Sequence, residues 1–283
     1  MLASDLGLEP GARKYAQRFM ELRRRLRSGR PLLGAWCVIP DSFTAELIGR
    51  AGYDWACLDM QHGMIREEHL GPMLQALQLT GTPALVRVPW NEPGRLMKAL
   101  DAGAEGVIVP MIDSPEDAVR AVQACRYPPA GNRSWGPIRA ALGVADYSPA
   151  TANESVVVTL MIETVGAVQH LDQILSVPGV DAAYVGPQDL SLTHGLRPTP
   201  TATEPEHIEL IRSVLEACGR HDVVPGLFCG DLESATEWRR RGFRLTNILS
   251  DSQLLRQGAA HQVQSLAQVE LGQLNTSTEE IRT

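Results

Sequence analysis

Residues 156–190 read VVVTLMIETVGAVQHLDQILSVPGVDAAYVGPQDL. The stretch opens with the apolar run Val156–Ile162, continues with the amphipathic segment Gly166–Leu175, and closes on a second apolar run, Ala182–Val185. Neither run alternates cleanly between apolar and polar residues, which is typical of strands that are buried on both faces of a parallel sheet. Two parallel strands joined by a helix form a β-α-β unit, and we expect one here.

The same succession of apolar run and helical pattern covers most of the chain. The runs expected to form strands are Leu32–Val38, Asp54–Leu58, Ala84–Val88, Gly106–Pro110, Val156–Ile162, Ala182–Val185, Val223–Phe228 and Arg244–Leu249. The segments expected to form helices between them are Thr44–Ala51, Pro93–Ala102, Pro115–Cys125, Gly166–Leu175, Glu204–Gly219 and Leu232–Arg241. Strands and helices that alternate in this way over about 250 residues predict a (β/α)₈ TIM barrel, as a single domain over residues 1–283. An open doubly wound sheet is the alternative, although no glycine-rich phosphate-binding motif follows the first run.

Both ends of the chain extend beyond the predicted barrel. Residues 1–30 are expected to form an N-terminal helical extension, in which Arg13–Arg30 is strongly basic. That segment is interpreted as a solvated helix across the bottom of the barrel or an oligomer contact, with anion binding as a further alternative. The segment Ser252–Leu271 predicts a long C-terminal helix, and residues 273–283 a polar tail.

Composition excludes several classes of function. The 283 residues include 26 Lys+Arg and 33 Asp+Glu, for a net charge of −7, which disfavours nucleic acids and anionic membranes as partners. No apolar run approaches the roughly 18–20 residues of a membrane span, and Met1–Pro10 lacks a signal-peptide pattern. The five cysteines form no CxxC pair, so we expect buried thiols in a reducing cytoplasm.

Reactive side chains gather where the predicted strands end. Asp59 and His62 follow the second run, Arg87 lies in the third, Glu163 follows the fifth, and Asp189 follows the sixth. The carboxyl ends of barrel strands meet at one rim, so we expect these groups to lie together. They could pair as structural ion pairs. Carboxylates without cysteines suit a hard divalent cation, Mg²⁺ or Mn²⁺, and an adjacent Arg and His would suit metal-assisted enolisation of a 2-oxo acid.

The scarcity of lysine argues against covalent imine chemistry. Lys14 and Lys98 are the only lysines. Lys14 precedes the first predicted strand, and Lys98 lies inside the helix after the third. A Schiff-base aldolase needs a lysine that points into the barrel, and neither residue is placed for that role.

Several motifs carry a family resemblance over roughly Gly34 to Gly258. They are Ala51-Gly52-Tyr53-Asp54-Trp55 with Asp59-Met60-Gln61-His62-Gly63, Arg87-Val88-Pro89-Trp90-Asn91, Leu100-Asp101-Ala102-Gly103-Ala104, Val109-Pro110-Met111, Arg126-Tyr127-Pro128-Pro129, Ile162-Glu163, and Val185-Gly186-Pro187-Gln188-Asp189-Leu190-Ser191. In this order and spacing the chain resembles the HpcH/HpaI aldolase family, the metal-dependent class II pyruvate aldolases.

The resemblance implies a barrel whose C-terminal helix is swapped between subunits of a hexamer, a trimer of dimers. It implies reversible cleavage of a 4-hydroxy-2-oxo acid to pyruvate, or a similar 2-oxo acid, and an aldehyde. By the same resemblance Glu163 and Asp189 bind Mg²⁺, Mn²⁺ or Co²⁺, and Arg87 stabilises the enolate. His62 acts as the base, through a metal-bound water or directly. Asp101 raises its basicity, which we expect to happen across a subunit boundary because Asp101 precedes the fourth strand.

Two positions depart from the family pattern, and other functions stay open. Gln61 replaces a Glu beside the histidine, and Met161 replaces a Gln that contacts substrate, which puts a long dicarboxylate substrate in doubt. At Gln188 the family uses the backbone amide for substrate. The alternatives are a lyase like citrate lyase or malyl-CoA lyase, a 2-oxo acid decarboxylase, and a 2-oxo acid binder without turnover.

Overall fold

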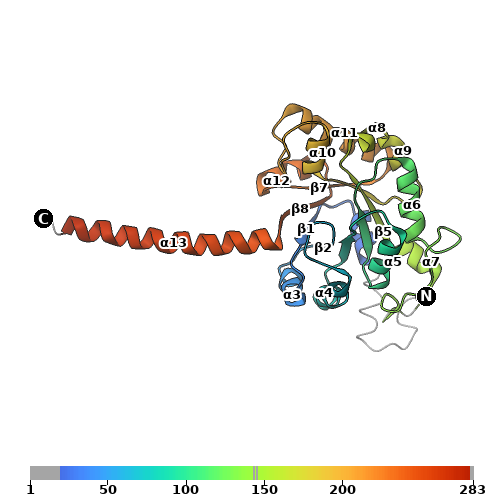
Figure 1. The fold of residues 1–283 in the computed structure, drawn as a ribbon, viewed down its shortest axis with the longest axis horizontal. Helices are drawn as coiled ribbons and strands as arrows, with labels where there is room; N and C mark the ends of the chain where they lie inside the picture. The colour runs from blue at the N-terminus through green and yellow to red at the C-terminus, as the bar shows by residue number, and fades with distance from the viewer. Residues whose placement is uncertain (1–19, 143, 145, 281–283) are drawn as a thin grey trace.

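Eight parallel strands close into a barrel in chain order, with β8 paired back to β1 (Figure 1). The computed structural model describes residues 20–142, 144 and 146–280, with side chains to residue 268. The strands are β1 (Leu32–Cys37), β2 (Trp55–Asp59), β3 (Ala84–Arg87), β4 (Gly106–Val109), β5 (Val157–Ile162), β6 (Ala182–Val185), β7 (Val224–Phe228) and β8 (Leu245–Ser250). Each end lies within one residue of the predicted run, and the (β/α)₈ barrel is confirmed.

Helices surround the barrel between successive strands (Figure 1). They are α3 (Ser42–Arg50), α4 (Glu67–Thr80), α5 (Pro93–Asp101), α6 (Pro115–Cys125), α7 (Pro149–Ser155), α8 (Val165–Gln169), α9 (Leu171–Leu175), α10 (Pro187–Thr193), α11 (Pro205–His221) and α12 (Leu232–Arg241). The segment predicted as one helix, Gly166–Leu175, is divided into α8 and α9 at His170, which leaves helical geometry at φ −104° and ψ 17°. Three of these helices, α4, α7 and α10, were not predicted; α4 contains Pro72, which interrupts the helical pattern.

The interior of the barrel is closed from below by α2 (Glu21–Arg27). Its buried side chains Leu22 and Leu26 pack in one cluster with inward-facing strand residues such as Leu85 and Val157. The backbone N–H of Leu22 also donates to Glu105 Oε2 (3.0 Å), directly before β4. In the described part of the N-terminal extension α2 thus lies across the barrel bottom, which is one of the interpretations of the basic segment, while residues 1–19 and Lys14 with them lie outside the described residues.

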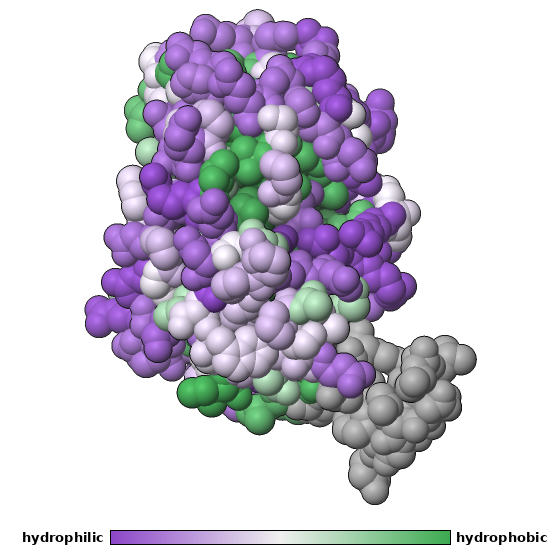
Figure 2. All heavy atoms as spheres, turned by 90° about the vertical axis from the view of Figure 1, so that its right-hand side faces the viewer, coloured by the Kyte–Doolittle hydropathy of each residue, from purple (hydrophilic) through white to green (hydrophobic). Residues whose placement is uncertain are grey.

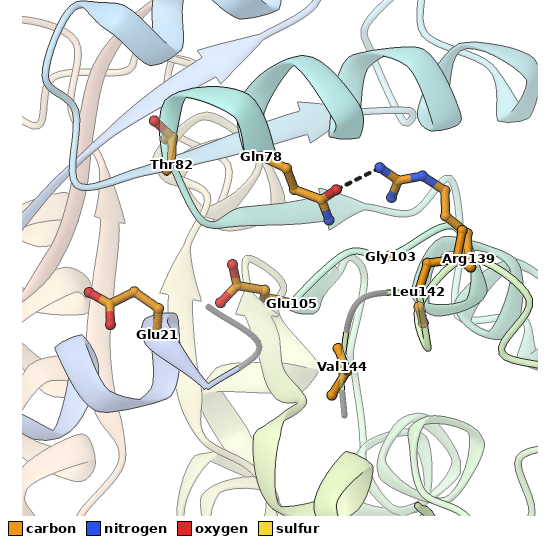
Figure 3. Close-up of a pocket in the computed structure, with 10 residues that line it drawn as sticks. Glu21, Gln78, Thr82, Gly103, Glu105, Arg139, Leu142 and Val144 are labelled. Carbon is orange, nitrogen blue, oxygen red and sulfur yellow. Dashed lines mark hydrogen bonds between the residues drawn. The ribbon is translucent and has the colours of Figure 1, made fainter. Parts of the chain in front are cut away.

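The helix α2 is called the plug below. A small hollow lies beside it, at the N-terminal ends of β3 and β4 (Figure 3). Gln78 and Arg139 meet on its wall, where Arg139 Nη2 donates to Gln78 Oε1 (2.7 Å). Carboxylates of Glu21 and Glu105 face the same space (Figure 3). The hollow belongs to the end of the barrel opposite the predicted rim.

The last helix, α13 (Asp251–Glu280), leaves the barrel instead of packing along it (Figure 1). It covers the predicted helix Ser252–Leu271 and continues through most of the segment expected to be a polar tail. Apolar side chains on it, including Leu255 and Val263, are exposed in the single chain. The swapped arrangement expected for this helix involves a second subunit, which a single chain does not contain.

The cysteines follow the expectation of buried thiols from the sequence. Cys37, Cys57, Cys125, Cys218 and Cys229 are all buried and free. Figure 2 shows a face that is mostly hydrophilic, with apolar atoms confined to patches. Among the described helices, none is both long and apolar enough to cross a membrane.

Candidate active site

A buried ion pair between Asp59 and Arg87 forms the centre of the rim. The two residues are direct partners in the register of β2 and β3, which places both side chains at the carboxyl ends of adjacent strands. Arg87 donates from Nε to Asp59 Oδ1 (2.9 Å) and from Nη2 to Asp59 Oδ2 (2.6 Å). Burial opposes ionisation of Asp59, but the hydrogen bonds and charge of Arg87 outweigh it, and the pKa of Asp59 lies below its ordinary value. Both groups are therefore charged at neutral pH.

Trp36 and Met161 hold the same guanidinium from two further directions. The ring of Trp36 lies 4.9 Å from Arg87 Cζ, and its Nε1 donates to Asp59 Oδ2 (3.1 Å). Arg87 Nη1 is 3.8 Å from the sulfur of Met161, which is buried in the barrel. A guanidinium has five N–H donors, so these contacts leave one on Nη1 and one on Nη2. Arg87 is therefore held in a fixed orientation and has two N–H groups left to donate to a substrate.

Glu163 follows β5 and is almost fully buried. Its Oε1 accepts the backbone N–H of Met111 (2.8 Å), a residue held at a positive φ of 54°, whereas its Oε2 has no hydrogen-bond partner among the described residues. The pKa of Glu163 is raised to about 7, mainly by burial and also by the charge of Asp189, against the opposing effects of the Met111 N–H and Arg87. A buried carboxylate oxygen without a hydrogen-bond partner is suited to bind a cation as an oxygen ligand.

Asp189 comes from the first turn of α10, directly after β6. It is half-buried, and Gln188 beside it is exposed. The backbone directly before α10 passes close to Glu163. Gly186 makes this close contact possible, because a Cβ there would lie 2.4 Å from Glu163 Oε2. Within the described residues no group of three or more His, Cys, Asp or Glu side chains could hold a metal. Glu163 and Asp189 could supply two carboxylate ligands to a divalent cation such as Mg²⁺, an ion that usually keeps several water or substrate ligands.

His62 lies on the loop after β2 with an exposed side chain. The backbone N–H groups of Gln61 and His62 both donate to Asp59 Oδ1 (3.0 and 3.3 Å). Gly63 keeps the turn tight, since a Cβ there would meet the Asp59 carbonyl oxygen at 2.2 Å. The loop that carries His62 is thus anchored to the carboxylate that also holds Arg87.

The structure changes the interpretation of Asp59 and places Asp101 where the sequence predicted it, away from the rim. Asp59, grouped with the metal ligands in the sequence, directs its oxygens to Arg87, Trp36 and the His62 loop. Asp101 ends α5, before β4, and pairs with Arg133 Nη2 (2.6 Å), so it lies away from the rim within one chain. Lys98 is an exposed residue of α5, as predicted, and is not placed for a Schiff base.

Trp36 and Met111 were not singled out by sequence reasoning. The inward direction of Trp36 follows from barrel closure, and the role of Met111 belongs to its backbone, so neither carries a side-chain signal. Only the motif Val109-Pro110-Met111 marked the neighbourhood of Met111.

A closed parallel barrel that gathers a fixed Arg–Asp pair and two further carboxylates at the carboxyl ends of its strands is the arrangement of a (β/α)₈ barrel enzyme. The chain belongs to the HpcH/HpaI aldolase/citrate lyase family, whose model matches residues 33–258. It is accordingly an aldolase, a carbon–carbon lyase, which confirms the resemblance found in the motifs.

Relatives and solved structures agree with this membership. The chain is 37% identical over 243 residues to a hydroxypyruvate/pyruvate aldolase of Rhizorhabdus wittichii, covering 86% of this chain and 96% of that one. It is 34% identical to a 4-hydroxy-2-oxo-heptane-1,7-dioate aldolase of Klebsiella pneumoniae, covering 83% and 89%. A crystal structure of a family member from Burkholderia cenocepacia superposes with a TM-score of 0.82 at 33% identity, covering 88% and 99%.

Proposed function

We propose that the chain is a divalent-metal-dependent aldolase that cleaves a 4-hydroxy-2-oxo acid to pyruvate, or a similar 2-oxo acid, and an aldehyde. The observation that carries this proposal is the buried Oε2 of Glu163, which has no partner among the described residues and lies near the charges of Asp189 and Arg87. Mg²⁺, Mn²⁺ or Co²⁺ held by Glu163 and Asp189 would polarise the 2-oxo group as a Lewis acid.

Arg87 acts on the oxygen that gains negative charge. When the bond between C3 and C4 breaks, its electron pair moves toward the 2-oxo oxygen and forms an enolate. The free N–H groups on Nη1 and Nη2 donate to that oxygen, and the pair with Asp59 prevents the guanidinium from turning away. Because Asp59 stays ionised, Arg87 keeps its charge throughout.

His62 moves the proton. In cleavage it accepts the proton of the C4 hydroxyl as the carbonyl of the aldehyde forms, and it returns a proton to C3 of the enolate. In condensation the same steps run in reverse, beginning with removal of a C3 proton from pyruvate. An imidazole suits this exchange because its ordinary pKa lies near neutrality.

Substrate contacts come from the strand ends around this centre. The 2-oxo acid carboxylate lies at the first turn of α10, where the backbone amides of Gln188 and Asp189 can donate. Met161 presents an apolar surface beneath Arg87, in place of an amide. This favours short-chain 2-oxo acids over long dicarboxylates.

The assembly proposed with this function is a homohexamer, a trimer of dimers, in the cytoplasm. Its support is α13, which projects from the barrel and exposes apolar side chains that a second copy can cover. In that assembly Asp101 of one subunit reaches His62 of a neighbour and raises its basicity. A sedimentation measurement tests the assembly, and an Asp101→Asn variant whose pH–rate profile matches the wild type would contradict the dyad.

The decisive experiment follows the methyl protons of pyruvate in D₂O by NMR. Metal-free protein is compared with protein loaded with Mg²⁺, Mn²⁺ or Co²⁺, because exchange reports enolisation without knowledge of the aldehyde. We expect metal-dependent exchange that is lost in His62→Ala and Arg87→Ala and kept in His221→Ala, a histidine at the end of α11 that pairs with Asp172. Exchange that survives chelation would contradict the metal dependence of enolisation. If folded protein shows no exchange with any metal, the result favours a thioester substrate, another 2-oxo acid or a 2-oxo acid binder without turnover.

A further inference from the structure

A second hollow, of about 270 Å³, lies at the bottom of the barrel, at the end opposite the active site. It lies between α2 and the N-terminal ends of β5 to β8, since Asp181 directly precedes β6 and Arg244 directly precedes β8. From α2 it receives Arg23 and Arg27, which are four residues apart and therefore share one face of the helix. The basic segment noted in the sequence thus has part of its charge facing a cavity.

One carboxylate serves two of the guanidinium groups at this place. Asp181 pairs with Arg23 through Oδ1, and with Arg126 Nη2 through Oδ2 (3.2 Å). Its Oδ2 also accepts the backbone N–H of Val158 (2.9 Å). Three of the about four acceptor sites of the Asp181 carboxylate are therefore occupied, which leaves little capacity for a third cation.

Arg27 and Arg244 have no ion-pair partner among the described residues, although both line the hollow. Arg27 also faces Arg23, and burial together with the charges of Arg126 and Arg27 lowers the pKa of Arg23 despite the opposing effect of Asp181. The remaining carboxylate on the wall is Asp222, an exposed residue at the end of α11. Three arginines thus face two aspartates, with Arg126 adding a further positive charge behind Asp181.

A buried donor in this wall lacks an acceptor. Arg23 Nε has no hydrogen-bond partner in the described structure, and Arg126 Nη1 nearby is in the same condition. The Arg126 side chain is only 6% exposed. Buried N–H groups without acceptors are costly, and a guanidinium binds tetrahedral oxyanions through paired N–H groups.

We propose that this hollow is a binding site for a small dianionic oxyanion, phosphate or the phosphoryl group of a phosphomonoester. Arg23, Arg27 and Arg244 bind it through the guanidinium N–H groups that line the hollow. Two negative charges match the excess of two positive ones, counted with Arg126. The bound anion would link α2 to the N-terminal ends of β6 and β8, and so stabilise the packing of α2 against the bottom of the barrel.

Calorimetric titration of the full-length protein with inorganic phosphate, against chloride at equal ionic strength, tests the site. Arg27→Gln and Arg244→Gln should each weaken phosphate binding about tenfold, the effect of losing one charge-assisted hydrogen bond. Arg24→Gln is the matched control on the same helix, because its side chain is 72% exposed and pairs with Glu21. It should bind phosphate like the wild type.

Two further titrations distinguish this hollow from the rim and the free anion from its ester. Arg87→Gln removes phosphate binding at the rim, and binding at the bottom of the barrel should remain in that variant. Glycerol phosphate in place of phosphate tells whether an esterified anion fits. The proposal is wrong if the wild type shows no saturable phosphate binding, or if Arg27→Gln and Arg244→Gln both titrate like Arg24→Gln.

Discussion

Glutamine in place of Glu163 should stabilise the metal-free protein at alkaline pH. The native carboxyl has a pKa of about 7 instead of 4.5, mainly because of burial. The folded state therefore holds its proton in a range where the unfolded state has lost it. This contribution to stability is fully present below pH 4.5 and is lost as the pH rises through 7.

The size of the effect follows from the two pKa values. A pKa raised from 4.5 to about 7 corresponds to about 3.4 kcal/mol. Linkage places about 2.5 kcal/mol of that loss between pH 5 and pH 8. Glu163→Gln is neutral throughout and keeps an oxygen for the N–H of Met111. Between pH 5 and pH 8 the unfolding free energy of the variant should therefore fall by about 2.5 kcal/mol less than that of the wild type.

Urea unfolding in the presence of a chelator, at pH 5 and pH 8, measures this difference. Titrating groups that do not interact with Glu163 are common to both proteins and cancel in the comparison. Glu68→Gln, an exposed position on α4, serves as a control and should give a difference near zero. A difference for Glu163→Gln under about 0.5 kcal/mol, or one of opposite sign, would refute the reasoning, since that is the scatter of ordinary surface substitutions.

Three further substitutions probe other parts of the structure. Asp59→Asn leaves the buried Arg87 without its counter-charge, so urea unfolding should reveal a loss of about 3–5 kcal/mol, and pyruvate exchange should vanish even in protein that is still folded. Gly186→Ala brings a Cβ to 2.4 Å from Glu163 Oε2; calorimetry should find Mg²⁺ affinity at least about tenfold weaker, and unchanged affinity would count against Glu163 as a ligand. Leu26→Ala removes a buried contact of the plug and should cost about 2–5 kcal/mol in the unfolding free energy; a loss under about 1 kcal/mol would mean that α2 does not close the barrel.

The strands were predictable because each is a short apolar run between turn residues, a pattern that depends on the local sequence alone. The positions of Glu163 and Asp189 at the rim were predictable for a related reason, because each follows such a run closely, where barrel enzymes carry their reactive groups. Helices interrupted by proline were less visible. Pro72 inside α4 breaks the pattern that the surrounding chain continues.

The partners of the site residues required information that a sequence does not contain. Asp59 looked like a metal ligand as long as the register of β2 and β3 was unknown; in register it lies opposite Arg87 and binds it. The stacking of Trp36 on Arg87 depends on the tilt of β1 in the closed barrel. Asp101 pairs with Arg133, which is 32 residues away in the chain and separated from it by β4 and α6, so no short-range pattern links the two.

The reactivity of the five buried thiols can be used to measure local opening of the native structure. Burial raises the pKa of Cys125, Cys218 and Cys229 to about 12, so the native thiols react slowly with alkylating reagents. Cys37 and Cys57 lie on β1 and β2, and the other three are distributed over α6, α11 and the end of β7. Alkylation followed by mass spectrometry would therefore time the exposure of five separate positions, and a cysteine added on the surface could carry a label without removal of the native ones.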